Sequence, residues 1–192
     1  RSDSQITVLV NNAGIATMGP LAQANIDQTQ RVIDLNITAF TRIATAAAPV
    51  FVTRQSGTII NIASVAALAP ELTSAVYSAS KAYVLAFTQA MQHELSAQGI
   101  QVQAVLPGAT RTEIWERAGT PVDQLPQEIV MPVDEMVDAA LTGLDQGELI
   151  TIPSLPDAAD WERFNNARLA LGPNLSRNAA AARYKTARTA AA

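Results

Sequence analysis

Tyr77 and Lys81 stand four residues apart in the segment YSASK (77–81). The surrounding pattern predicts a helix, and residues at i and i+4 lie on the same helical face. A phenol with an ordinary pKa of about 10 is a poor base at neutral pH, but a nearby ammonium group favours the phenolate. Lowering that pKa by roughly three units takes about 4 kcal/mol. The pair is therefore a candidate proton-transfer site, although in isolation this spacing more often marks a half-buried tyrosine beside a solvated lysine.

Two nearby residues have simpler interpretations. Tyr83 has Phe87 rather than a lysine four positions on, so we expect it to pack or to form an interface. His93, the single histidine, lies about four helical turns beyond Tyr77. Because metal binding needs several ligands and no partner cluster accompanies His93, we predict no metal site.

The elements that must position these residues alternate between strands and helices. Short apolar runs, of which ITVLV is the first, are typical of parallel strands buried on both faces. The expected strands are 6–10, 58–64, 100–108 and 148–153, and the expected helices are 27–54, 74–97, 133–146 and 157–171. Thr73 or Ser74 could cap the second helix, and Pro49 should perturb the first. Alternation of this kind predicts an α/β fold with a doubly wound parallel sheet.

Small or hydrogen-bonding residues follow three of these strands. They are Asn11–Gly14, Ala63–Ser64 and Pro107–Thr110. Each segment alone is ordinary turn chemistry. Because ligands of open α/β sheets bind beyond the carboxyl ends of the strands, the three together predict one binding crevice.

Composition excludes several classes of protein. The 192 residues are 48% hydrophobic and 16% charged, with a net charge of −4 and no cysteine. The scattered basic residues offer no stripe for nucleic acid. Without cysteine, disulfide scaffolds and thiolate zinc sites are excluded, and we expect a cytoplasmic protein. The longest apolar stretches are interrupted by Asp34, Asn36, Arg42 and Pro49, so no membrane span is expected.

Length and composition suit one domain over residues 1–175, followed by a low-complexity, alanine-rich tail over 176–192. The chain begins at Arg1, close to its first strand, and has neither a methionine nor a signal peptide there. We expect it to be a fragment of a longer protein.

Four motifs carry a family resemblance. VLVNNAG, INIASV, YSASK and LPGATRT occur in the order and spacing of the compact short-chain dehydrogenase/reductase family, and the likeness extends from about Ile6 to Pro153. As a set the motifs are highly specific, whereas the tyrosine–lysine spacing alone is not. The resemblance implies a Rossmann-like sheet and an NAD(P)-dependent oxidoreductase that interconverts a carbonyl and a secondary alcohol.

The resemblance also implies roles for individual residues. Tyr77 matches the general acid/base, and Lys81 matches the residue that binds the nicotinamide ribose and lowers the tyrosine pKa. Ser64 matches the hydroxyl that holds the substrate oxygen, and Asn36 the asparagine of a distorted helix in the proton relay. The implied cofactor-binding residues are Asn11, Ala13, Gly14, Tyr77, Lys81, Pro107, Gly108, Thr110 and Thr112.

The chain departs from the family at its start. The glycine-rich turn and the residue that selects between NAD and NADP are absent, and GIATMG (14–19) follows the wrong strand. The N-terminal third of the family domain is therefore expected to be missing. The cofactor would be NAD or NADP, with NADP favoured by the reductase interpretation, although the chain alone should bind it weakly or not at all. The strand at 6–10 would lack a neighbour.

Partners and alternatives complete the expectations. The family pairs subunits through helix faces that match 36–54 and 77–97 here, which implies a homodimer or homotetramer. Residues 113–117, including Ile114 and Trp115, match a substrate lid of the family, which suggests a modestly hydrophobic substrate. Trp161 is expected to anchor the terminal helix. One alternative is an extended sugar-nucleotide epimerase or dehydratase, which the short stretch after Lys81 disfavours. The other is a non-catalytic dinucleotide-fold binding or interaction protein.

Overall fold

The computed structural model describes residue 3 and residues 5–185. The chain divides into two compact units, Arg1–Ser154 and Leu155–Ala192. The predicted boundary between residues 175 and 176 stays a prediction. Of the expected alanine-rich tail, residues 186–192 lie outside the described part of the chain.

The first unit is built on four parallel strands. These are β1 (Val8–Asn11), β2 (Gly57–Ile62), β3 (Ile100–Val105) and β4 (Ile150–Thr151), and their spatial order follows the chain. The register places Asn11 beside Asn61 and Asn61 beside Ala104. All four strands fall within or beside the ranges predicted from the sequence, and the predicted α/β class with a parallel sheet is confirmed.

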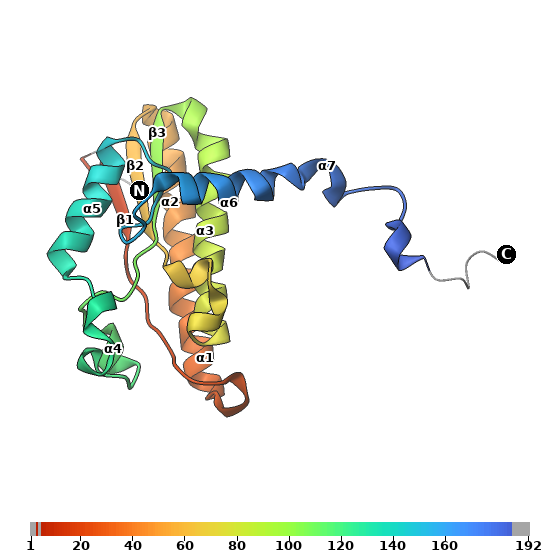
Figure 1. Cartoon of the computed structure of the whole chain (residues 1–192). Coiled ribbons are helices and arrows are strands. Elements are labelled where there is room, and N and C mark those ends of the chain that lie inside the picture. The colour runs from red at the N-terminus through yellow and green to blue at the C-terminus, as the bar shows by residue number, and fades with distance from the viewer. Residues whose placement is uncertain (1–2, 4, 186–192) are drawn as a thin grey trace. The chain divides into compact units, whose positions relative to one another are not determined.

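Two long helices cover one face of the sheet. Helices α2 (Phe40–Arg54) and α3 (Ala75–Leu95) run alongside the strands in Figure 1. The buried core on this face consists of Ala44, Phe51, Ile59, Met91, Leu95, Ile100 and Val102. Each large apolar side chain removed from water contributes about 1.5–3 kcal/mol, so this layer fixes α3, and with it the residues at its start, against the sheet.

The other face is covered only in part. Helix α5 (Val133–Asp145) packs beside β3 and β4, where Gln103 Nε2 donates hydrogen bonds of 2.8 Å to Ala140 O and 2.8 Å to Thr151 Oγ1. Val8 and Val10 on β1 are 49% and 52% exposed. The prediction that this strand is buried on both faces is therefore wrong, because only the face that carries Leu9 packs against the core. The expectation that it lacks a neighbour on one edge is confirmed, since β1 ends the sheet order.

The first long helix is distorted around Asn36, as the family resemblance implied, and not at Pro49, where the sequence pattern predicted a perturbation. Helix α1 (Ile26–Ile33) begins at Asn25, whose side chain accepts a hydrogen bond from Gln28 N. A π-helical turn, Asp34–Ala39, then separates α1 from α2. Helix α2 continues through Pro49 to Arg54, so the irregular turn surrounds Asn36 instead of Pro49.

The shorter elements connect these layers. Helix α3 is capped by Ser74, as predicted, with Tyr77 N donating to Ser74 Oγ. Helix α4 (Ile114–Arg117) lies between β3 and α5. Single 3-10 turns occur at Leu21–Gln23, Val65–Ala67, Pro70–Leu72, Ser96–Gln98, Val122–Gln124, Gln127–Ile129 and Ala182–Tyr184.

The second unit contains α6 (Ala158–Ala170) and α7 (Gly172–Leu175). Asp157 caps α6 by accepting a hydrogen bond from Ala159 N. The rings of Trp161 and Phe164 lie 5.6 Å apart between centroids, and α6 buries none of its residues. The ring of Trp161 thus packs on its own helix; its predicted role as an anchor stays a prediction.

Within the described residues, the helical stretch Ile26–Arg54 is long and apolar enough to cross a membrane by length and composition alone. The expectation from the interrupting polar residues had been that no such stretch occurs. The finding is weak support for a membrane span, because core helices of soluble proteins meet the same criterion.

Candidate active site

The carboxyl ends of β1, β2 and β3 meet around one cavity of about 800 Å³. Its lining includes Asn12 and Gly14 after β1, residues 63–66 after β2, and residues 107–110 after β3. The first turns of α3 add Tyr77 and Lys81. The three strand exits thus converge as the topology of the predicted sheet requires.

Ser64, Tyr77 and Lys81 come together in this cavity. Lys81 Nζ lies 5.8 Å from the centroid of the Tyr77 ring and donates a 2.9 Å hydrogen bond to Ile62 O. The Ser64 side chain hydrogen-bonds Tyr77. Ser64 Oγ is itself fixed, because it accepts from Ala66 N at 3.1 Å. A phenol, a hydroxyl and an amine therefore border the same space.

Burial shifts the pKa values of the two titratable side chains in this cavity, Tyr77 and Lys81. It raises the pKa of Tyr77 above the usual value near 10, and the hydrogen bond with Ser64 offsets this effect only in part. Burial also lowers the pKa of Lys81 to about 8. The expected lowering of the tyrosine pKa by Lys81 is therefore not found. The physical reason is desolvation by burial, which disfavours the charged phenolate. In this state Tyr77 is a neutral phenol that can donate a proton.

Asn36 lies behind the cavity instead of in its wall. Its Oδ1 accepts a 3.0 Å hydrogen bond from Ile15 N, and its Nδ2 donates to Ile15 O at 2.9 Å and to Ser80 Oγ at 3.0 Å. The side chain is buried. Asn36 thus ties the loop after β1 to α3, and the π-helical turn gives its side chain this position.

Five of the predicted cofactor-binding residues besides Tyr77 and Lys81 line the cavity: Gly14, Pro107, Gly108, Thr110 and Thr112. A Cβ atom at Gly14 would lie 3.4 Å from both Asn36 Oδ1 and Lys81 Nζ, so the glycine leaves this corner open. The sequence therefore places small residues where a flat ligand could approach the backbone.

Asn11 and Ala13 are not among the residues that line the cavity. Asn11 Nδ2 donates to Asn61 Oδ1 at 2.8 Å, and Asn61 Nδ2 donates to Thr88 Oγ1 at 2.9 Å. This chain of hydrogen bonds joins β1 to β2 and β2 to α3. Asn11 therefore supports the sheet, and its implied contact with the cofactor stays a prediction.

An apolar wall of the cavity was largely missed from the sequence. Ile114 and Trp115, which were expected in the substrate lid either to contact substrate or to pack within the lid, both line the cavity. Further apolar lining residues, not singled out in advance, are Met18, Leu72, Leu125, Ile129, Met131 and Met136. They come from segments far apart in the chain and have no common motif. Asn12, part of the first strand exit that was predicted to border the crevice, is also a lining residue.

Tyr83 packs as predicted. Its hydroxyl lies 2.8 Å from Thr41 Oγ1, and its ring stacks on that of Phe87 at 5.7 Å. Between residues 5 and 185, the structure contains no cluster of three or more His, Asp or Glu side chains that could hold a metal ion.

Comparison with known proteins adds a family assignment to this geometry. The sequence profile described as short chain dehydrogenase matches residues 3–122. A 3-oxoacyl-[acyl-carrier-protein] reductase from Synechocystis is 42% identical over 113 residues, which is 59% of this chain and 46% of that protein. The chain spans about half the length of the curated relatives it matches.

Two solved structures resemble nearly the whole chain. A short-chain dehydrogenase from Sphingobium yanoikuyae in complex with NADPH is 50% identical, with a TM-score of 0.92 over 96% of this chain and 72% of that one. A bulky-bulky ketone specific alcohol dehydrogenase from Comamonas testosteroni is 43% identical, with a TM-score of 0.86 over 97% of this chain and 70% of that one.

Proposed function

The chain belongs to the short-chain dehydrogenase family, and from that premise we propose that it carries the catalytic part of an oxidoreductase that interconverts a carbonyl compound and a secondary alcohol with NAD or NADP. The observation that carries the proposal is the meeting of Ser64, Tyr77 and Lys81 in one cavity with an apolar wall. Proton transfer to a carbonyl oxygen needs a positioned acid, and a neutral phenol in a buried site is one.

In the reducing direction, Tyr77 donates its phenolic proton to the substrate oxygen as the carbonyl becomes an alcohol. Ser64, held through Ala66 N, orients that oxygen by a hydrogen bond. Lys81 holds positive charge beside the ring and stabilises the phenolate that remains. A nicotinamide cofactor, when bound, would supply the hydride. In the oxidising direction the phenolate accepts the alcohol proton.

The residues present suit the nicotinamide half of such a cofactor. Gly14 and Gly108 present no side chain to the cavity, and a Cβ at Gly108 would have only Ser154 Oγ, at 3.8 Å, within contact range. Thr110 and Thr112 add hydroxyl groups to the same wall. The NADPH bound by the Sphingobium relative favours NADP over NAD.

For the substrate we propose a ketone with bulky apolar groups on both sides of the carbonyl. The cavity is large, and its wall is formed mainly by apolar side chains, three methionines among them, and by Trp115. The specificity in the name of the Comamonas relative agrees with such a cavity. Pairing of subunits through the faces of α2 and α3, and a cytoplasmic location, stay predictions.

The test compares two tyrosines. In an active preparation, either this chain or a longer polypeptide that contains it, Tyr77→Phe should lower kcat for NADPH-dependent ketone reduction by roughly 10²–10⁴-fold, because general acid catalysis contributes about that much. The dissociation constant of NADPH should change little. Tyr83→Phe is the matched control, since it removes a hydroxyl that contacts Thr41 outside the cavity.

Retention of most activity by Tyr77→Phe would refute the proposed acid. If every preparation binds NADPH but none turns over any ketone, the non-catalytic alternative gains support instead.

A further inference from the structure

A loop of residues 111–131 covers the apolar side of the cavity; we call it the substrate loop. Its two ends are fastened together beyond β3. Thr110 and Met131 form a parallel bridge, in which Arg111 N donates to Met131 O at 3.0 Å and Met131 N donates to Ala109 O at 2.8 Å. The base of the loop is therefore closed by backbone hydrogen bonds.

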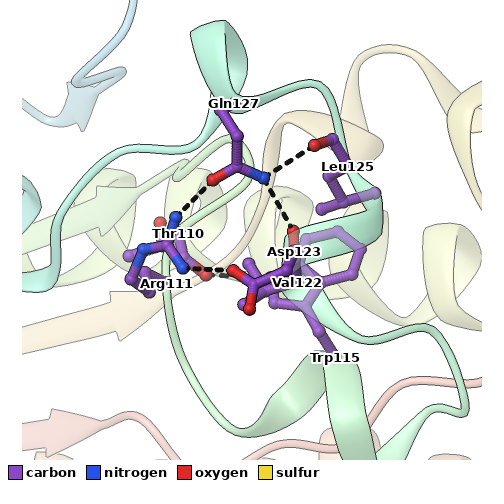
Figure 2. Close-up of polar contacts among 7 residues, drawn as sticks. All are labelled: Thr110, Arg111, Trp115, Val122, Asp123, Leu125 and Gln127. Atoms are coloured by element: carbon purple, nitrogen blue, oxygen red, sulfur yellow. Dashed lines mark hydrogen bonds and ion pairs between the residues drawn. The ribbon is translucent and has the colours of Figure 1, made fainter.

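A second connection crosses the inside of the loop, as Figure 2 shows. Arg111 Nη1 donates to Asp123 Oδ1 at 2.8 Å, and Arg111 Nη2 donates to Gln127 Oε1. Gln127 Nε2 in turn donates to Val122 O at 3.2 Å and to Leu125 O at 2.7 Å. One guanidinium and one amide thus join the start of the loop to both of its 3-10 turns.

This brace lies next to the wall of the cavity without being part of it. Trp115 Nε1 donates a 2.8 Å hydrogen bond to Thr110 O, the residue before Arg111. Trp115, Leu125 and Ile129 line the cavity, whereas Arg111 does not. The braced turns carry Leu125 and Ile129 toward the same space that Trp115 borders. The positions of Leu125 and Ile129 relative to Trp115 depend on how far the two 3-10 turns lie from the start of the loop, and the hydrogen bonds of Arg111 set that distance.

We infer that Arg111 is a positioning residue, which holds the substrate loop so that Trp115, Leu125 and Ile129 form one wall and limit the size of the ketone that fits. The word substrate rests on the proposed function, but the bracing itself does not. Arginine suits this task because its planar fork reaches two acceptors at once, which a lysine cannot do with fixed geometry.

The same loop contains a matched control. Arg117 Nη2 donates to Glu113 Oε2 at 2.5 Å, but this pair joins residues one turn apart at α4 and cannot brace the loop. Its side chains are 72% and 80% exposed, compared with 48% and 84% for Arg111 and Asp123. Loss of either pair removes one surface ion pair, so any difference between the variants reflects the connection across the loop.

The experiment uses the 192-residue chain and needs no cofactor. The chain has two tryptophans, so Trp161→Phe leaves Trp115 as the only indole emitter. In that background we expect Arg111→Ala to increase acrylamide quenching of Trp115. We also expect roughly fivefold faster chymotryptic cleavage within the loop, because the weak bonds of an exposed brace bias a local opening equilibrium. Arg117→Ala should leave both readouts at the parent values.

Two further variants make the result decisive. Gln127→Ala removes the amide that joins Arg111 to both turns and should reproduce the effect of Arg111→Ala even if the latter folds poorly. Arg111→Lys should restore the parent behaviour only in part. In an active preparation, Arg111→Ala should raise KM for a bulky ketone with little change in kcat, which a general loss of folded protein would not do.

The inference is overturned if Arg111→Ala and Gln127→Ala both keep the parent quenching and cleavage rates, or if Arg117→Ala changes them equally. A failure of the proposed oxidoreductase activity would be recognised separately, because fluorescence and cleavage would still respond to Arg111.

Discussion

Burial acts in opposite directions on the two titratable side chains of the cavity. It raises the pKa of the Tyr77 phenol and lowers the pKa of the Lys81 ammonium to about 8, and in both cases it favours the neutral form. The spacing of the two residues was visible in the sequence, but spacing alone suggested only the attraction of unlike charges. With a raised pKa, Tyr77 keeps its proton near neutral pH.

Burial of the Lys81 ammonium group should lower the free energy of unfolding, and the size of this effect should depend on pH. Its folded pKa of about 8 lies below the usual value of 10.5. Below about pH 8 Lys81 is charged in both the folded and the unfolded state, so the folded state bears the full cost of burying an ammonium group. Between about pH 8 and 10.5 the unfolded state binds more protons, and the free energy of unfolding rises with pH. Lys81→Met should therefore stabilise the chain by about 1–2 kcal/mol at pH 7, after loss of the hydrogen bond to Ile62 O.

The measurement is chemical denaturation of both proteins at intervals from pH 7 to pH 9.5. The gain from Lys81→Met should keep its full value up to about pH 8 and shrink at higher pH. A gain that does not vary with pH, or an outright loss of stability at pH 7, would contradict a desolvated lysine at this position.

At the scale of elements, the π-helical turn Asp34–Ala39 is fixed by a single side chain. Asn36 makes three hydrogen bonds, two to the backbone of Ile15 and one to Ser80. Net contributions of about 1 kcal/mol per bond, together with partners left buried, predict that Asn36→Ala lowers the free energy of unfolding by about 2–4 kcal/mol. Thermal unfolding followed by circular dichroism measures this loss.

Asn166→Ala provides the comparison, since Asn166 is an exposed asparagine on α6. It should leave the melting temperature within experimental scatter. If Asn36→Ala proves equally harmless, the turn is held by its backbone alone and Asn36 is not the residue that fixes it.

At the scale of the molecule, the sheet has a partly uncovered face beside one of its edges. Val8 and Val10 are about half exposed on β1, an edge strand of the sheet. Exposed apolar edge strands promote association between chains, and a lysine on the edge opposes it. Val8→Lys should therefore slow the aggregation of concentrated protein measured by light scattering.

Leu169→Lys introduces the same charge at a residue that is 56% exposed on α6, away from any strand. It should have little effect on aggregation. Equal protection by the two substitutions would attribute the effect to net charge and not to the sheet edge.

By itself the sequence determined the fold class, the family and the convergence of three strand ends. The family follows from the resemblance of four motifs. The fold class and the convergence follow from local regularities: apolar runs alternating with long helices define a parallel sheet, and the carboxyl ends of parallel strands share one edge. The four-residue spacing also placed Tyr77 and Lys81 on one face of α3. The catalytic roles assigned to them stay predictions.

Only the tertiary structure decided how those residues behave. The direction of the Tyr77 pKa depends on burial, the partner of Asn11 is fifty residues away, and Arg111 meets Asp123 and Gln127 across a folded loop. The exposure of Val8 depends on which face of β1 packs against the core. Each of these results from side chains brought together by the fold from distant segments, which periodicity and spacing along the chain do not encode.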